Sequence, residues 1–425
     1  MEEYLDEAEE LLRDVIQSRD ISTLVVLHHL CDLAWVLDNL KLYDECHLTG
    51  NCALALADAL GRRSLEFRHE QAGTLSLIAG LSVYQPRACT LFGQAIFICE
   101  EVVENNASHS NKYKLFIVLH RAGYLVKSHP SAQWLERAVQ LMTKELPPTM
   151  VDPRRRSAIY NNYGTCLGRL EQYSNAFEAC HKAVSIRRTL GDNAKHDPDF
   201  AQTLMNMGSA LFETGKYDDA IAAYEEVLGI CTTMSTQDPL RYNDLRAKAL
   251  LCYGVTLQKL NQVSEAAEVG KQAVSLLRNL AQTGKECTNL LCYALHKYGI
   301  SCALLGLHEE AVLVYQESIC LRRALAATDS EGKKYLIWSL HDLANSFRAL
   351  DKYAEANTAA IEALEKNRGR VLEGCLFTPI FSACVVCQRG IIPDSLQIIS
   401  PPLPFFRFIF SPRVLGILQQ VLPLG

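Results

Sequence analysis

Cysteine and histidine are the residues of this chain whose types and spacing could do chemistry. Cys384 and Cys387 are separated by two residues, which is the spacing of a redox-active dithiol. Such a dithiol works at the start of a helix that follows a strand, and the surrounding sequence predicts neither element. Cys292 and His296 lie four residues apart, as two zinc ligands on one helix would. Because this second pair falls in a regular helical pattern, we interpret it as core filling.

Other catalytic patterns are missing from the sequence. We find no glycine-rich phosphate loop, no nucleophile elbow and no zinc-protease motif. Paired acids such as Glu225 and Glu226 are most simply the solvated face of a helix. His28 and His29 are expected to be half-buried structural residues. We therefore predict that the chain is not an enzyme and that it has no cofactor or metal ion.

Length and composition restrict the class of protein. The chain has 425 residues, and a single hydrophobic core usually stops growing at about 250 to 300 residues. It must therefore divide into domains or grow as an array of repeats. Hydrophobic residues make up 49% of the chain and charged residues 21%, which is a balance typical of folded proteins. The formal charge of -6 offers no basic surface for nucleic acid.

Cysteine usage and hydropathy indicate a compartment. The 16 cysteines are scattered singly through helix-patterned sequence, and the chain starts with an acidic segment from Met1 to Asp6. That start does not resemble a signal peptide, so we expect reduced thiols and a cytoplasmic location. No uncharged apolar run reaches the roughly 18 residues that a membrane span needs, so we expect no span.

One pattern of small residues returns at a nearly constant interval. Its first members are separated by 44, 46, 45 and 45 residues, and they are Gly164, Gly208, Gly254, Gly299 and Ala344. Twelve residues after each of them stands an alanine, namely Ala176, Ala220, Ala266, Ala311 and Ala356. A regular interval of this length indicates a repeat architecture rather than a single core.

The small residues indicate where two helices cross closely. A missing or methyl-sized side chain lets two helix backbones approach to packing distance. We expect the first small residue on a helix A, and the alanine on a helix B that runs back along it. A short turn such as residues 213–217 joins them, and acids such as Asp218 suit the positive start of helix B.

The residues around the small positions strongly resemble tetratricopeptide repeats. The resemblance rests on Gly164 with Tyr173 and Ala176, preceded by the paired asparagines Asn161 and Asn162. The common repeat of that family has 34 residues, and the longer period here, with residues 196–199 before a helix A, is similar to kinesin light chain and to uncharacterised fungal repeat proteins. The resemblance implies an all-α fold, a right-handed α-solenoid of antiparallel helix pairs that forms a tetratricopeptide-like superhelix.

The pattern divides the chain into three parts. Residues 1–21 read as an N-terminal helix, and residues 22–369 as an array of about eight repeats, three of them irregular. Residues 370–425 form an apolar, proline-rich tail without helical periodicity. Either this tail folds back onto the array, or it is an altered end of a longer protein, which is the interpretation we favour.

The resemblance also implies a binding groove. In tetratricopeptide arrays, the concave groove is lined by helix A positions three and six residues before the small residue and one and four residues after it. These positions carry aromatic, amide and cationic groups with few acids, which suits a peptide with apolar anchors and a carboxylate or two. The candidates are Asn161, Thr165, Gln202, Ser209, Phe212, Lys248, Gln258, His296, Trp338, His341, Asn345 and Arg348. Packing between repeats is the alternative role for several of them.

Recognition of chaperone tails is not supported by the residues of the groove. The carboxylate clamp of chaperone-binding relatives needs a set of Lys, Asn and Arg side chains over three successive repeats. Only Asn206 and Lys248 match that set, while Thr165 and Cys252 depart from it. Asn206 stays a candidate for the groove.

The sequence therefore predicts a non-catalytic adaptor or scaffold that binds a peptide segment of a partner protein in the concave groove. The alternative is the regulatory or sensor repeat region of a larger signalling ATPase or caspase-like effector protein, here without its effector module. An array that is not sealed at its C-terminal end could also self-associate through that end.

Overall fold

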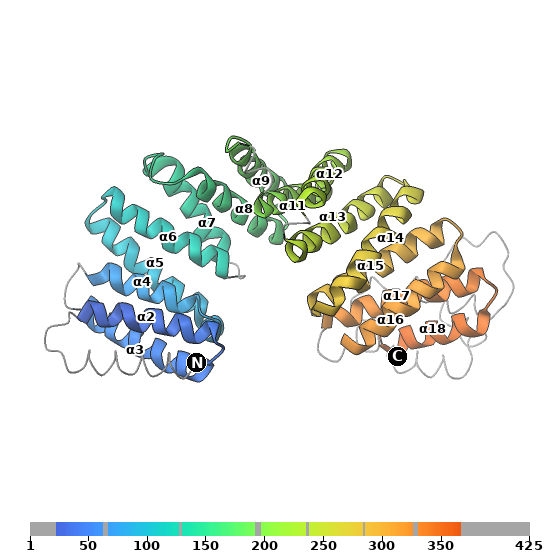
Figure 1. The fold of residues 1–425 in the computed structure, drawn as a ribbon, viewed down its shortest axis with the longest axis horizontal. Coiled ribbons are helices and arrows are strands. Elements are labelled where there is room, and N and C mark those ends of the chain that lie inside the picture. Colours follow the sequence, from blue (N-terminus) through green and yellow to red (C-terminus); the bar gives the residue numbers. More distant parts are fainter. Residues whose placement is uncertain are drawn as a thin grey trace, which may run out of the picture. The chain divides into compact units, whose positions relative to one another are not determined.

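The computed structural model describes residues 23–62, 67–126, 130–191, 197–234, 238–283, 285–325 and 330–366. These residues form α-helices joined by short turns, and no strand occurs among them. The chain divides into two compact units, residues 1–195 and residues 196–425. Each unit is built of helix pairs that follow one another along the sequence (Figure 1).

The first unit contains four consecutive helix pairs in its described part. Their first and second helices, in order, are α2 (Thr23–Asn39) and α3 (Tyr43–Gly61), α4 (Arg68–Ala79) and α5 (Ala88–Asn105), α6 (His109–Leu125) and α7 (Pro130–Gln140), and α8 (Pro153–Arg169) and α9 (Tyr173–Arg188). A 3-10 helix, η2 (Ser82–Arg87), precedes α5, and a π-helical turn, η3 (Leu141–Glu145), follows α7.

The second unit also contains four pairs in its described part. They are α11 (Pro198–Glu213) and α12 (Tyr217–Met234), α13 (Pro239–Lys259) and α14 (Val263–Leu280), α15 (Lys285–Leu304) and α16 (His308–Leu325), and α17 (Ser330–Ala349) and α18 (Tyr353–Lys366). A short 3-10 helix, η4 (Ala281–Thr283), follows α14.

Three of the first helices start in the same way. An aspartate caps the helix and a proline follows it, at Asp152, Asp197 and Asp238. The aspartate carboxylate accepts a hydrogen bond from a backbone N–H of the first turn, which would otherwise be without a partner. Proline is favoured at the first helical position because it has no N–H to satisfy. The sequence therefore fixes these helix starts locally.

The turn within each pair of the second unit uses a left-handed residue seven positions after the small residue. In the second unit these residues are Gly215 (φ 78°), Asn261 (φ 61°), Gly306 (φ 77°) and Asp351 (φ 58°). The next backbone N–H then donates back to a carbonyl five residues earlier, as from Leu307 to Cys302 at 2.9 Å. This arrangement ends the first helix and satisfies one of its last carbonyls.

The small residues lie at the helix crossings, as predicted. A Cβ atom added to Gly208 would lie 2.6 Å from the Tyr224 ring, and one added to Gly299 would lie 2.5 Å from the Tyr315 ring. Both rings are fully buried and cannot move aside. The ring of the second helix therefore occupies the space of the missing side chain on the first.

Two crossings have a small residue on both helices. Gly254 faces Gly270, and an added Cβ would only reach ordinary contact at 3.6 Å from Val269. At the last crossing, Ala344 and Ala360 stand at the corresponding positions, and both are buried. The alanines twelve residues after the small residues are buried at every crossing, with exposed fractions from 0% to 2%.

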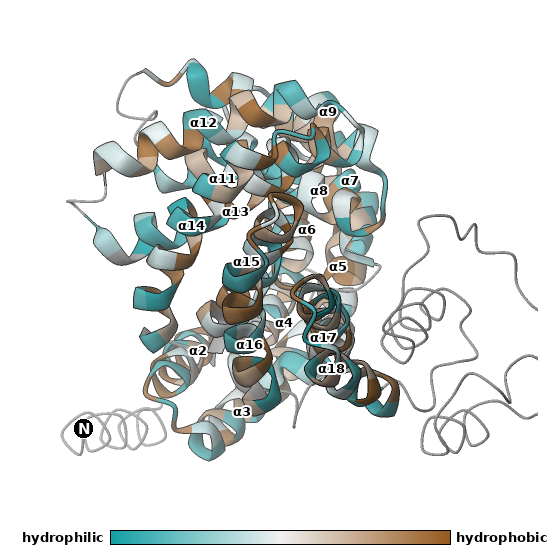
Figure 2. Cartoon of the chain, turned by 90° about the vertical axis from the view of Figure 1, so that its right-hand side faces the viewer, coloured by the Kyte–Doolittle hydropathy of each residue, from teal (hydrophilic) through white to brown (hydrophobic). Residues whose placement is uncertain are grey.

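The core runs between the helices of each unit. Buried apolar residues form one cluster from Leu27 to Ile159 in the first unit, and another from Ala247 to Leu364 in the second. Along each helix, hydrophobic and hydrophilic residues alternate so that stripes of both kinds are visible (Figure 2). The predicted all-α fold of stacked helix pairs is confirmed.

One local expectation is wrong. His28 and His29 are exposed rather than half-buried. The side chain of His28 is 58% exposed and its Nε2 lies 3.2 Å from Glu70 Oε2 on α4. They occupy the outer side of α2, while the apolar stripe with Leu27 and Leu30 faces the core.

Some expectations lie outside the described residues. These are the N-terminal helix of residues 1–21, the tail of residues 370–425 and the Cys384 and Cys387 pair. The proposed boundaries of the array stay a prediction. Among the helices that the structure describes, none combines the length and the apolar character that a membrane crossing requires.

Candidate functional site

Neighbouring first helices are joined by polar contacts along one side of the second unit. Arg241 on α13 pairs with Asp199 on α11 at 2.7 Å. Gln258 on α13 donates to the Ser301 hydroxyl on α15, also at 2.7 Å. Contacts of this kind place α11, α13, α15 and α17 side by side, and we call their common surface the helix A face.

The second helices are joined by ion pairs instead. Arg278 on α14 pairs with Glu317 on α16 at 2.6 Å, and Arg323 on α16 pairs with Glu362 on α18 at 2.6 Å. Both pairs are partly exposed and join residues 39 positions apart. We call this second surface the helix B face. Each of its two arginines is paired with a glutamate.

The first unit repeats the polar joining of first helices. His69 on α4 is bonded to Asn111 on α6 at 2.9 Å, and Asn162 on α8 contacts His120 on α6 at 3.3 Å. Asn161 and Thr165, two predicted groove residues, lie partly exposed on the same helix α8.

The structure places the predicted groove residues of the second unit on its four first helices. Ser209 is exposed and His296 is buried, while the remaining nine are partly exposed. Those nine are Gln202, Asn206, Phe212, Lys248, Gln258, Trp338, His341, Asn345 and Arg348. Their role as a binding site stays a prediction.

Several of these side chains are engaged within the protein. Gln258 donates to the Lys297 carbonyl as well as to Ser301. Lys248 forms an ion pair with Asp244 one turn earlier at 2.6 Å, so its charge already has a partner. Gln202 donates to the Asn206 amide oxygen at 3.1 Å.

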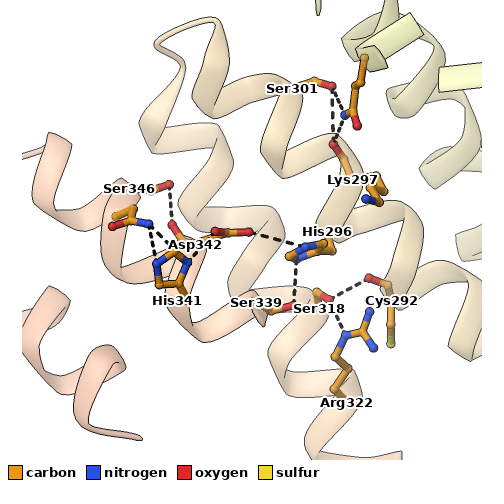
Figure 3. Close-up of polar contacts among 12 residues, drawn as sticks. Cys292, His296, Lys297, Ser301, Ser318, Arg322, Ser339, His341, Asp342 and Ser346 are labelled. Carbon is orange, nitrogen blue, oxygen red and sulfur yellow. Dashed lines mark hydrogen bonds and ion pairs between the residues drawn. The ribbon is translucent and has the colours of Figure 1, made fainter. Parts of the chain in front are cut away.

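His296 is part of a polar network between α15 and α17 (Figure 3). Its Nδ1 lies 3.1 Å from the Ser339 hydroxyl, and its Nε2 lies 3.5 Å from Asp342 Oδ2. Asp342 also faces His341 at 3.0 Å. Burial lowers the pKa of His296 to about 4, and the Asp342 carboxylate opposes this shift only in part. His296 is therefore neutral near pH 7.

This network contains a serine, a histidine and an aspartate, but its geometry does not suit nucleophilic catalysis. Ser339 is 0% exposed and His296 is 5% exposed, so a substrate could not reach the hydroxyl. A nucleophile has to meet its substrate within the site. The network instead satisfies polar groups buried between two repeats.

Cys292 and His296 are both buried within the packing of α15. Cys292 is fully buried, and burial raises the pKa of its thiol to about 11, so it stays protonated. Across the described ranges, no group of three or more potential ligand side chains is close enough to hold a metal ion. The core-filling interpretation of these two side chains is confirmed by their burial.

The structure brings together a group of residues that the sequence pattern singled out only in part. The rings of Tyr293 and Tyr335 lie 6.0 Å apart, and those of Tyr335 and Trp338 lie 5.4 Å apart, both edge to face. Lys297 Nζ stands 5.3 Å from the Tyr293 ring, and Arg322 Cζ 4.9 Å from the Tyr335 ring. We call these five residues the aromatic-cation cluster.

The position of Arg322 in the repeat is shared by a second arginine, and this could have been seen in the sequence. It stands 23 residues after Gly299, and Arg187 stands 23 residues after Gly164. Each arginine is buried and donates its Nε to a serine, Ser318 and Ser157 respectively. A charged residue at the same position of two second helices breaks the apolar pattern of those helices. This break in the pattern would have marked Arg322 in the sequence.

Parts of the chain match known repeat families. Two family models, both described as tetratricopeptide repeat, match residues 155–233 and residues 336–373. No curated protein matches the chain significantly.

Several solved structures are similar to the chain. The apo form of RapI has a TM-score of 0.52 at 10% identity, and the match covers 86% of this chain and 98% of that one. A signal transduction ATPase with numerous domains and a tetratricopeptide repeat sensor, from Pyrococcus horikoshii, has a TM-score of 0.52 at 16% identity, with 87% and 53% covered. At these identities the likeness shows the fold alone.

Repeats of a putative kinesin light chain from Podosopora anserina are also similar, at 20% identity and a TM-score of 0.40, with 52% of this chain and 97% of that one covered. The matches to the family models agree with the helix pairs and their small-residue crossings. Repeats of this kind support a protein-interaction scaffold. The chain therefore contains tetratricopeptide repeats, matched at residues 155–233 and 336–373, and resembles the repeat proteins of that family.

Proposed function

We propose that the helix A face of the second unit binds a peptide segment of a partner protein, and that the chain serves as a non-catalytic adaptor. The observation that carries this proposal is the composition of the face. None of its predicted groove positions is Asp or Glu, and most of their side chains are partly exposed. Aromatic and amide groups on a rigid helical support are suited to holding a peptide.

The polar contacts between neighbouring first helices support the same proposal. Bonds such as that from Gln258 to Ser301 fix the spacing between α13 and α15. A surface whose parts are held in place before binding loses less entropy when a ligand arrives. The face is thus prepared for a ligand that crosses several repeats.

A peptide selection tests this proposal. Displayed random peptides would be selected on the full chain, and the affinity of a selected peptide would be measured for Arg348→Glu and for Lys271→Glu. Arg348 lies on the helix A face, whereas Lys271 is exposed on α14. We expect the first substitution to weaken binding about tenfold or more and the second to leave it unchanged.

Equal weakening by both substitutions would contradict the assignment of the face. Circular dichroism of both variants checks that the helices remain folded. The alternative function, a regulatory region of a larger signalling protein, has no separate observation in its favour.

A further inference from the structure

The outer side of α2 is more exposed than the corresponding side of later first helices. In the five repeats with regular spacing, the residues five positions before and two positions after the small residue are buried, with exposed fractions from 0% to 5%. They are Ile159, Thr203, Ala249, Ala294 and Ser339, and Cys166, Ala210, Thr256, Ser301 and Ser346. On α2, whose small residue is Ala34, these positions hold His29, which is exposed, and Val36, which is 37% exposed. Together with Val25, which is 41% exposed on the same side, we call them the outer face of α2.

In later repeats, the preceding second helix helps to bury these positions. Cys166 on α8 belongs to one apolar cluster with Ala132 and Leu135 on α7. Ala294 on α15 likewise shares a cluster with Leu277 on α14. A first helix therefore has one side that a preceding second helix is needed to cover, because each repeat of such an array packs on its neighbours.

The sequence directly before α2 has the pattern of a helix with one apolar side. At 3.6 residues per turn, every apolar residue from position 4 to position 16 falls on one side, and every charged residue falls on the other. The apolar residues are Tyr4, Leu5, Ala8, Leu11, Leu12, Val15 and Ile16. A helix of this length is marginal in water by itself and is stabilised by packing its apolar side against a partner.

Residues 11–15 also match the end of α14 in type and in position. They read Leu-Leu-Arg-Asp-Val, and residues 276–280 of α14 read Leu-Leu-Arg-Asn-Leu. Leu12 stands 22 residues before the small residue Ala34, just as Leu277 stands 22 residues before Gly299. Residues 11–15 therefore have the spacing at which a second helix reaches the next first helix.

We propose that residues 4–16 dock on the outer face of α2 as the second helix of an incomplete first repeat. Leu12 then takes the place beside α2 that Leu277 has beside α15, and the acidic side of the segment stays in solvent. The docked segment closes the first edge of the array, so that the second helix of another copy is kept from stacking there. The proposal is independent of peptide binding by the helix A face.

The length of the connection favours this segment over a second copy of the chain. Only residues 17–22 separate it from α2, which begins at Thr23. A short connection of this kind gives the segment an effective concentration in the millimolar range at its docking surface. A second copy would in addition lose the translational and rotational freedom of a separate molecule.

Hydrogen–deuterium exchange tests the proposal. Exchange of the full chain is compared with that of a synthetic peptide of residues 1–21. Leu12→Asp places a charge on the apolar side of the segment. Gln17→Asp is the matched control, because it makes the same charge change on the polar side. Val36→Asp alters the receiving surface instead of the segment.

We expect the amides of residues 4–16 to exchange about tenfold or more slowly in the full chain than in the peptide, because a docked helix exchanges only when it opens. Leu12→Asp and Val36→Asp should each remove this difference. Leu12→Asp should also speed up exchange in α2 while leaving α8 unchanged. Gln17→Asp should alter neither segment.

Three results would overturn the inference. One is equal exchange of residues 4–16 in the full chain and in the peptide. Another is an effect of Leu12→Asp that is no larger than that of Gln17→Asp. The third is protection that appears only at high protein concentration, together with the mass of two chains in light scattering, which would show that a second copy covers the outer face of α2.

Discussion

The helix pairs α13/α14 and α15/α16 have the same plan but differ at their crossings. Gly254 on α13 faces Gly270, and an added Cβ would find ordinary contacts. Gly299 on α15 faces Tyr315, whose ring fills the space. The same glycine position in the repeat pattern therefore has a different role in the two pairs. In α15/α16 the Tyr315 ring excludes any larger residue, whereas in α13/α14 a methyl group would fit.

The difference continues along the first helix and in the turn. Three residues before the small residue stands Leu251 on α13 and His296 on α15, and both are buried. The left-handed turn residue is Asn261 in the first pair and Gly306 in the second. Corresponding positions of two neighbouring repeats therefore provide matched experiments within one chain.

The largest effect is expected at the crossings. Gly299→Ala would place a Cβ 2.5 Å from the buried Tyr315 ring, and overpacking of this kind costs about 1 to 3 kcal/mol. Gly254→Ala should stabilise by up to about 1 kcal/mol, because alanine is the better helix former and space is present. Denaturant unfolding followed by circular dichroism compares the two variants with the wild type. Destabilisation of similar size in both would show that the two crossings do not differ as described.

A smaller effect is expected from the pH dependence of stability. The pKa of His296 is about 4 in the folded chain, whereas an unfolded histidine titrates near 6.5. Between these values the unfolded chain binds the proton and the folded chain does not, so stability falls as the pH falls. His296→Leu, which copies Leu251, should remove this contribution.

The measurement is the unfolding free energy of both chains as a function of pH. Acidification from about pH 7 to about pH 5 should cost the wild type about 2 kcal/mol more than His296→Leu. The charged and titratable groups that act on His296 are Asp342, Lys297, Arg322 and His341, and they are retained in the variant. Parallel pH profiles would be inconsistent with a neutral His296 in the folded chain.

The smallest effect is expected in the turns. Asn261 adopts a φ of 61°, a left-handed conformation that glycine adopts without steric cost. Asn261→Gly should therefore stabilise by about 0.5 kcal/mol and Gly306→Asn should destabilise by a similar amount, since asparagine tolerates this region better than other side chains. Thermal unfolding of the two single variants and the double variant gives both values. A shift of the same sign in both variants would refute the matching of the turns.

Much of the fold could be predicted from the sequence because its signals are local. The period of small residues located the crossings, and Asp197 with its following proline marked a helix start. The exposure of His28 was misjudged because adjacent residues on a helix point about 100° apart, and one apolar neighbour does not decide burial.

The candidate site was less accessible to prediction because its residues meet across elements. The register rule identified Trp338 but not Tyr335, which lies three residues earlier on the same helix. Lys297 and Arg322 come from different helices, and their common setting depends on how deeply each is buried and on which charged groups other helices bring near them. Burial and contacts between helices of this kind cannot be read from spacing along the sequence.

The capping aspartates have a consequence for how this array can change its length. Asp197 and Asp238 each begin a first helix with an internal hydrogen bond, and the turn that follows carries its own left-handed residue. A helix pair thus contains its start, its reversal and its crossing within one stretch of sequence. Copying the segment from Asp197 up to Asp238 adds a complete module, and the junction falls where the chain is about to restart a helix in any case. Unequal recombination at these aspartate-proline pairs would lengthen or shorten the array by whole repeats.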